Sequence, residues 1–509
     1  MAAPTMTAPD SGVKVRMYRQ GLGDCFLLAF PSSGRSAKAR FVLIDCGVLL
    51  GTPEGVARVR RVAEHIVEST GGRLDLLIAT HEHWDHLSGF EQARDVFDKL
   101  KIEEVWVAWT EDPEDGVANG LRRKRETALR ALTSSAARLR ASGDRDAAAS
   151  AGQIDSVLGF FGELGVDGKP TGCERAMDYV VERGKPPRYR VPGEGPLALP
   201  GVSGARAYVL GPPRGVELKR SDPRAGEAYE KSLALNEETA FFAAALAVHE
   251  RAGEIAMSPE EKELERLSFP FDKAFRVKVE DARADPFFQE LYYGAANAAD
   301  TADTASVAGA ADPLSDKELA WRRIEADWMG ASKVLALRLD NDTNNTSLAL
   351  AIELAGSGKV LLFPGDAQAG NWRSWHDLKW PRKGEPDNPV TAEDLLKRTV
   401  LYKVGHHASH NATLRGKGLE LMEHPDLVAM IPVHEEMAHK PKGGNPNGWD
   451  MPFPPLLRKL EEKAKGRVLR VDKGMPTRPR KASEAEWKEE FTDRCLEDEL
   501  YVEITIPDK

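Results

Sequence analysis

The sequence predicts an α/β fold, and three observations lead to that class. Short apolar runs typical of strands alternate with amphipathic helical segments near both ends of the chain. Acids and histidines follow several of these runs directly, as they do where strand ends carry a site. With 509 residues, 41% hydrophobic and 29% charged, the chain has the length and composition of a globular protein with a large core.

The first elements are three strands and a helix. Residues 13–20 alternate in polarity, residues 25–30 follow a glycine-rich turn, and residues 41–47 form a buried-type apolar run that ends at an acid. A helix is expected next, because Thr52 is a good cap, Pro53 suits the first helical position and Gly71-Gly72 ends the pattern. A strand over 73–80, a helix over 90–100 and a strand over 102–109 follow.

The middle of the chain predicts two helical insertions. Residues 110–175 are rich in alanine, arginine and leucine, and residues 214–333 are mostly helical in pattern, with a mobile loop expected over 295–312. Strand-like runs return at 333–340, 347–354, 359–366 and 401–405. We therefore expect one discontinuous domain over 13–475, with a core of about 13–109, 176–213 and 334–475, followed by a helix and strand in 476–509.

Charge and cysteine content narrow the class of protein. The net charge of -10 disfavours a general binder of nucleic-acid backbone. The clearest basic run, 122–125, lies beside further arginines on the first helix, and a solvated helix face is its simplest interpretation. The 4 cysteines have no CxxC spacing, so we expect a reduced chain in the cytoplasm without disulfides. Neither a signal peptide nor membrane insertion is expected.

The main chemical signal is an HxHxDH motif directly after the strand over 73–80. It consists of His81, His83, Asp85 and His86. Histidines two positions apart on an extended segment can hold one metal ion, and Asp85 with His86 can hold a second. This mixture of imidazole and carboxylate ligands is typical of zinc, iron or manganese sites.

Two later clusters also end apolar runs. Asp366 follows the run at 359–363, and the pair His406-His407 follows the run at 401–405. Taken alone, Asp366 would be interpreted as a turn residue, and the histidine pair as ordinary surface or core residues. Because strand ends at one edge of a sheet converge, we expect all three clusters to form one site.

These motifs together resemble the metallo-β-lactamase-fold hydrolases, and among them the soluble hydrolase domain of ComEC-type competence proteins. The resemblance rests on the HxHxDH motif, the GDA at Asp366, and further short matches at 20–24, 44–47, 344–348, 403–409 and 452–474. It implies an αββα sandwich that carries two divalent metal ions.

The resemblance also implies roles for individual residues. His81 and His83 would bind the first metal, Asp85, His86 and His407 the second, and Asp366 would bridge both. His406 is the alternative to His407. Asp45 would hydrogen-bond a ligand histidine, and Ser409 and His410 would either support a ligand or contact the substrate. Many relatives supply one more histidine; between His86 and Asp366 this chain has only His249, which we expect to be an ordinary helix residue.

The expected function is metal-dependent hydrolysis of a phosphoester, with Asp85 and Asp366 as catalytic residues. The substrate would be a phosphodiester, a nucleotide or a nucleic acid, and the metal zinc, with manganese or iron as alternatives. A hydrolase of a lactone, thioester or lactam is a second hypothesis, since one fold supports several chemistries. A third is a non-catalytic metal-binding protein whose helical insertions bind a protein partner.

Overall fold

The structure is a computed structural model. It describes residues 5–32, 38–141, 145–163, 170–219, 223–224, 226–229, 277, 279–288, 331–382, 384–385, 387–440 and 448–509. The chain divides into two compact units, and the first comprises Met1–Glu126, Gly152–Ala234 and Ala336–Lys509. This unit contains both ends of the chain and every strand described below.

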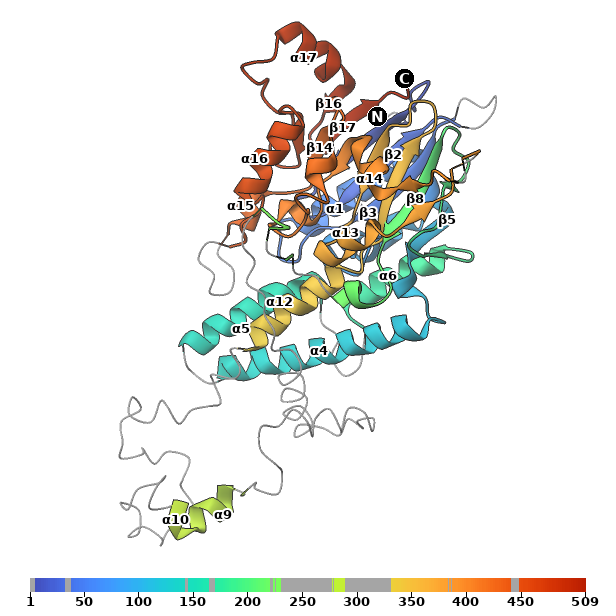
Figure 1. Ribbon diagram of the computed structural model, residues 1–509. Coiled ribbons are helices and arrows are strands. Elements are labelled where there is room, and N and C mark those ends of the chain that lie inside the picture. The colour runs from blue at the N-terminus through green and yellow to red at the C-terminus, as the bar shows by residue number, and fades with distance from the viewer. Residues whose placement is uncertain are drawn as a thin grey trace. The chain divides into compact units, whose positions relative to one another are not determined.

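An 8-stranded mixed sheet forms one half of the first unit. Its strands, in spatial order, are β16 (Cys495–Glu497), β17 (Tyr501–Ile506), β1 (Val13–Tyr18), β2 (Cys25–Phe30), β3 (Arg40–Cys46), β4 (Arg73–Ile78), β5 (Lys101–Ala108) and β6 (Arg188–Arg190). Neighbours from β16 to β3 are antiparallel, and those from β3 to β6 are parallel. The first and last strands of the chain therefore pair, as the adjoining blue and red strands of Figure 1 show.

A 7-stranded mixed sheet forms the other half. Its order is β15 (Val468–Arg470), β14 (Val428–Ile431), β13 (Thr399–Lys403), β10 (Val360–Phe363), β9 (Ala349–Leu354), β8 (Ala205–Gly211) and β7 (Leu197–Ala198). The strands from β15 to β10 are parallel, and those from β10 to β7 are antiparallel. A small hairpin adds β11 (Lys379–Trp380) and β12 (Val390–Thr391).

The two large sheets share one hydrophobic core. Alternate side chains of each sheet enter it, such as Val13, Val15 and Met17 of β1 and Leu350 and Ile352 of β9. The rings of Phe26 and Phe363, one from each sheet, meet edge to face with centroids 5.7 Å apart. Alternation along the strands thus buries one face of each sheet against the other.

Helices cover the other face of the 8-stranded sheet. A second core cluster joins its strands to α1 (Gly55–Thr70), α2 (Trp84–Gln92), α3 (Arg94–Phe97) and α6 (Gly172–Arg183). α1 begins two residues later than expected, with Glu54 rather than Thr52 at its N-cap, and it ends as predicted at Gly71. A capping box between Thr171 and Glu174 starts α6.

Shorter helices complete the first unit. They are η1 (Trp109–Glu111), η2 (Gly159–Phe161), η3 (Val216–Lys219), α13 (Ala369–Trp375), α14 (Ala392–Lys397), η9 (His406–Ala408), η10 (Leu419–Leu421), α15 (Glu435–Ala438), α16 (Pro454–Lys463), α17 (Glu484–Glu490) and η11 (Thr492–Arg494). α13 packs on β8 and its Trp372 ring meets Tyr402 of β13 edge to face, while α14 packs on β10. The 7-stranded sheet therefore also has helices against it (Figure 1).

The second unit comprises Thr127–Ala151 and Leu235–Leu335. Its described elements are most of α4 (Gly116–Ala141), the first half of α5 (Arg145–Leu158), α9 (Val279–Ala284) and α10 (Pro286–Phe288). Helices therefore do occupy much of 110–175, as expected. The loop expected over 295–312 and His249 lie outside the described residues. Within the described chain, no helix combines the length and apolarity needed to cross a membrane.

One strand prediction was wrong. Residues 333–340 alternate in polarity and were expected to form a strand, but they belong to α12 (Ala331–Asn344). Within the helix, Leu335 and Leu339 are buried, whereas Leu337 between them is 51% exposed. Leucines at alternate positions fit a strand, but those four apart also share one face of a helix, so this short run is ambiguous.

A matched pair of substitutions tests the helical assignment. Leu339→Ala removes a buried side chain and should lower the free energy of unfolding by about 2–5 kcal/mol. Leu337→Ala, two positions earlier, should change it by no more than about 0.5 kcal/mol because that side chain is exposed. Urea unfolding followed by circular dichroism measures both values. Equal losses would contradict the helix, since residues two apart share a face only in a strand.

Candidate metal centre

The three sequence clusters meet at the ends of parallel strands. The HxHxDH motif follows β4, Asp366 follows β10, and His406-His407 follows β13. β4 lies beside β3, which carries Asp45 near its end, and β10 lies beside β13 in the other sheet. The expected convergence of strand ends thus occurs, and it involves both sheets.

Four of the predicted residues form one compact cluster. Ligand atoms of Asp85, His86, Asp366 and His407 all lie within 4.8 Å of one another. His407 Nε2 is 2.7 Å from Asp85 Oδ2, and His86 Nε2 is 3.1 Å from Asp366 Oδ2. Each of the four residues is at most 1% exposed. We call these four residues the Asp/His cluster.

The donor set of the Asp/His cluster fits a divalent metal ion. Two imidazole nitrogens and two carboxylates are ligands that zinc and related ions accept. His86 Nε2 and Asp85 Oδ1 are buried and form no hydrogen bond of normal geometry with any described residue. Buried polar atoms are normally satisfied, so these two are atoms that a bound cation would satisfy.

Hydrogen bonds from outside the cluster fix its histidine rings. Asp45 Oδ2 lies 2.8 Å from His86 Nδ1 and also accepts a hydrogen bond from the Thr80 hydroxyl at 2.7 Å. His407 Nδ1 lies 2.7 Å from the carbonyl oxygen of Pro432. Both rings therefore present Nε2 to the cluster, and Asp45 has the expected contact with a candidate ligand histidine.

The histidines at 406, 407 and 410 have different surroundings. His407 contacts Asp85, whereas His406 donates its backbone N–H to Asp366 Oδ1 at 2.8 Å and its ring Nδ1 lies 2.8 Å from the Ser409 hydroxyl. Burial lowers the pKa of His406 to about 4, so its ring is neutral. His410 is exposed, with its ring centroid 6.2 Å from that of Phe453. The structure thus brings His407, rather than His406, into the cluster.

The segment that carries these histidines is held in a rare conformation. His406, His407 and Ala408 have φ values of 44°, 52° and 63°, all in the left-handed region. Non-glycine residues seldom adopt this region, and runs of them are concentrated at functional sites. The conformation sends successive side chains in different directions, which explains why adjacent histidines have different neighbours.

His81 and His83 lie next to the Asp/His cluster but outside it. Their nearest ring nitrogens, His81 Nε2 and His83 Nδ1, are 3.1 Å apart. The ring of His83 packs against Phe160 and Phe161. Burial lowers the pKa of His83 to about 4 and lowers that of His81 as well, so both are neutral and able to bind metal.

Two glycines let the backbone come close behind the motif. A Cβ on Gly47 would lie 2.3 Å from the carbonyl carbon of Asp85, and one on Gly23 would lie 2.6 Å from the Asp85 oxygen. The Asp24 N–H donates to that same oxygen at 2.9 Å. Glycine at these positions therefore allows the turn at 20–24 and the end of β3 to support the start of α2.

Lys403 and Asp24 lie in the short matches at 403–409 and 20–24, but sequence reasoning gave neither of them a role in the site. The Lys403 ammonium is buried, 2.5 Å from Asp24 Oδ2, 2.9 Å from Asp366 Oδ1 and 2.8 Å from the Gly365 carbonyl. A charged residue at the end of an apolar strand, three residues before His406, was a signal for Lys403. Asp24 ends the short match at 20–24, but a turn explains an aspartate without any site.

The site holds more buried acid than buried base. Burial alone would raise the pKa of Asp85, but the His86 and His407 imidazoles lower it to about 2. Burial raises the pKa of Asp24 despite the neighbouring Lys403. Burial alone would lower the pKa of His86, but the charges of Asp366 and Asp24 raise it well above its usual value. The carboxylates thus favour positive charge at His86, where a bound metal ion would supply it.

The basic run at 122–125 is largely engaged within the chain. Arg122 donates to the carbonyl oxygens of Thr110 and Asp112 at 2.6 and 2.9 Å. Arg125 forms an ion pair with Glu82, which lies between the first two histidines of the motif. The run therefore does reach the metal motif, through a buried ion pair rather than as a free basic surface.

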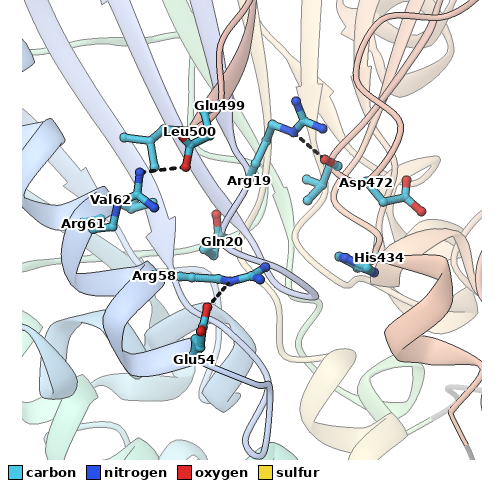
Figure 2. Close-up of a pocket in the computed structure, with 11 residues that line it drawn as sticks. Arg19, Gln20, Glu54, Arg58, Arg61, Val62, His434, Asp472, Glu499 and Leu500 are labelled. Atoms are coloured by element: carbon cyan, nitrogen blue, oxygen red, sulfur yellow. Dashed lines mark hydrogen bonds and ion pairs between the residues drawn. The ribbon is translucent and has the colours of Figure 1, made fainter.

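A pocket of about 410 Å³ lies apart from the Asp/His cluster, and no residue of the cluster lines it (Figure 2). Its arginines already have carboxylate partners: Arg61 is 2.9 Å from Glu499, and Arg19 is 2.9 Å from Glu497. Such paired arginines are weak anchors for an anion. The candidate site is therefore the buried cluster and not this pocket.

Removing the buried ammonium should be costly. Lys403→Met leaves Asp24 and Asp366 without the buried ammonium that contacts both, so we expect the metal-free protein to lose about 3–5 kcal/mol of stability. Lys397→Met, on an exposed surface ion pair, should change little. Denaturant unfolding in chelator compares the two. A Lys403→Met protein as stable as the control would show that Lys403 does not neutralise these acids.

Metal affinity should fall as the pH falls. The ion needs neutral imidazoles at His86 and His407, and nearby carboxylates raise the pKa of both above the usual value despite burial. Metal binding must then release protons, so the apparent affinity should weaken by up to about tenfold per pH unit for each proton released. Calorimetric zinc titrations between about pH 6 and 8 measure this slope. An affinity independent of pH would contradict the assignment of these ligands.

Comparison with known proteins assigns no family to this chain. A scan against protein-family models and searches of curated proteins and of solved structures give no match. The function must therefore be inferred from the side chains of the site and their surroundings.

Proposed function

We propose that this chain is a metal-dependent hydrolase of phosphodiesters, built as an αββα sandwich of the metallo-β-lactamase type. The observation that carries the proposal is the Asp/His cluster, in which four buried ligands from three strand ends lie within 4.8 Å of one another. Helices against both sheets and a core shared between the sheets support the sandwich.

The ligands suit hydrolytic metal chemistry. Asp85, His86, Asp366 and His407 would hold one divalent ion, with zinc as the first candidate and manganese or iron as alternatives. A bound ion supplies a Lewis acid and lowers the pKa of a coordinated water toward neutrality. A second ion would be held beside it by His81 and His83, with Asp366 as the bridging ligand that the resemblance implies.

The protein groups around the cluster have distinct tasks in this proposal. Asp85 and Asp366 hold negative charge where they can orient the attacking water. Lys403 contacts Asp366 and, with His86, keeps the pKa of Asp366 well below its usual value despite burial. Asp45 fixes the ring of His86 and favours the tautomer whose Nε2 faces the cluster.

The charge distribution favours a small phosphodiester over a long nucleic acid. The chain carries a net charge of -10. Arg122 and Arg125 belong to the clearest basic run of the sequence, but both make contacts within the chain. A long polyanion gains most of its affinity from unpaired basic groups. A cyclic or short nucleotide diester needs far fewer.

Activity assays with two aspartate variants test the proposal. The metal-loaded protein should hydrolyse bis(p-nitrophenyl) phosphate or a cyclic nucleotide, and a chelator should abolish the reaction. Asp366→Asn should lower kcat/KM by at least about a hundredfold, because it removes a charged group aimed at the reacting centre. Asp377→Asn, an exposed position in the same region of sequence, should leave kcat/KM unchanged.

The substrate panel also decides between reaction classes. It should include DNA, RNA, cyclic nucleotides and simple diesters, together with a lactone, a thioester and a lactam. Turnover of one of the last three alone would replace the phosphodiesterase proposal with another hydrolase activity. No turnover of any substrate by fully loaded protein would favour the non-catalytic metal-binding hypothesis.

A further inference from the structure

Two buried polar atoms face each other beside the Asp/His cluster without a hydrogen bond between them. His83 Nε2 and Asp340 Oδ1 are 3.7 Å apart, and neither has a hydrogen-bond partner among the described residues. His83 is 1% exposed and Asp340 7% exposed. Asp340 lies on α12, in a part of the helix that belongs to the first unit together with the motif.

The separation is unsuited to a hydrogen bond but suits a shared cation. A hydrogen bond between nitrogen and oxygen needs about 2.7–3.2 Å. Two atoms that each lie about 2.0–2.2 Å from one metal ion stand roughly 3–4 Å apart, depending on the angle between the bonds. A buried carboxylate without a cationic partner is also costly, and the described residues place no lysine or arginine within ion-pair distance of Asp340.

A third oxygen lies on the same helix. Asn344 is one helical turn beyond Asp340, and its Nδ2 donates to Asp340 Oδ2 at 3.2 Å. That bond leaves Asp340 Oδ1 for another partner. The Asn344 Oδ1 atom is buried and is likewise without a partner among the described residues. Two oxygens from one helix face and one imidazole nitrogen form a mixed donor set that zinc or manganese accepts.

The other ring nitrogen of His83 is oriented by its neighbours. His83 Nδ1 faces His81 Nε2 at 3.1 Å, and Phe160 and Phe161 pack against the ring. These contacts hold the imidazole so that Nε2 points to Asp340. The aromatic rings also exclude water, which strengthens the interaction between a cation and the carboxylate.

We propose that Asp340 and His83, with the amide oxygen of Asn344, hold a divalent cation beside the Asp/His cluster. Asp340 is thereby a metal ligand supplied by α12. The inference concerns the second ion of the proposed centre, but it requires only cation binding and not phosphodiester hydrolysis. Metal counting can therefore test it independently of turnover.

The experiment measures bound metal in the full-length protein. Zinc-loaded protein is freed of excess zinc, and its zinc content is determined by mass spectrometry, with calorimetric titration for affinity. Wild type should hold two ions per chain, and Asp340→Asn and Asp340→Ala one. The matched control is Asp342→Asn on the same helix, which lies about 200° around the axis and should keep two. Asp366→Asn should lose the ion of the Asp/His cluster.

Stability separates loss of a ligand from loss of the fold. Removing a buried carboxyl that has no cationic partner should leave the melting temperature of the metal-free protein unchanged or higher. The rise in melting temperature on adding zinc should be smaller for Asp340→Asn than for wild type. Asp340 variants that bind as much zinc as wild type, with unchanged affinity, would overturn the proposal. Absence of activity with two ions bound would instead count against the proposed function.

Discussion

The structure depends on the concentration of negative charge where the two sheets meet. Asp24, Asp45, Asp85, Asp340 and Asp366 are all at most 7% exposed. The one lysine among them, Lys403, contacts Asp24 and Asp366. Buried carboxylates are stable only when they are paired, protonated or bound to metal. The strands, glycines and helix ends in this region hold these acids together and place positive charge beside them.

The backbone achieves this by bringing chain segments far apart in sequence to one place. β4 leads into the HxHxDH motif in one sheet, and β10 and β13 lead to Asp366 and His407 in the other. The shared core between the sheets therefore fixes the distance between Asp85 and His407, which are 322 positions apart. The glycines at 23 and 47 and the left-handed run at 406–408 provide the local fit. Small changes in the packing of the two sheets would alter the metal site directly.

The sequence predicted the parts of this site that carry a local signal. His81, His83, Asp85 and His86 form a dense motif, and Asp366 and His407 follow clear apolar strands. Lys403 and Asp24 lie in short matches to the resembled family, but a lone lysine or a turn aspartate has an ordinary explanation, so neither was given a role. Asp340 was hidden by a wrong assignment of its segment to a strand, because alternating leucines over eight residues do not distinguish a strand from a helix. The contact of Arg125 with Glu82 depends on how distant segments fold together, which no local pattern reveals.

The central claim is that a metal ion binds among Asp85, His86, Asp366 and His407. Anomalous X-ray diffraction from zinc-loaded crystals, collected on both sides of the zinc absorption edge, tests it most directly. We predict an anomalous peak in contact with ligand atoms of all four residues, with His407 bound through Nε2. Zinc-loaded crystals with these four side chains ordered and no anomalous peak between them would contradict the account.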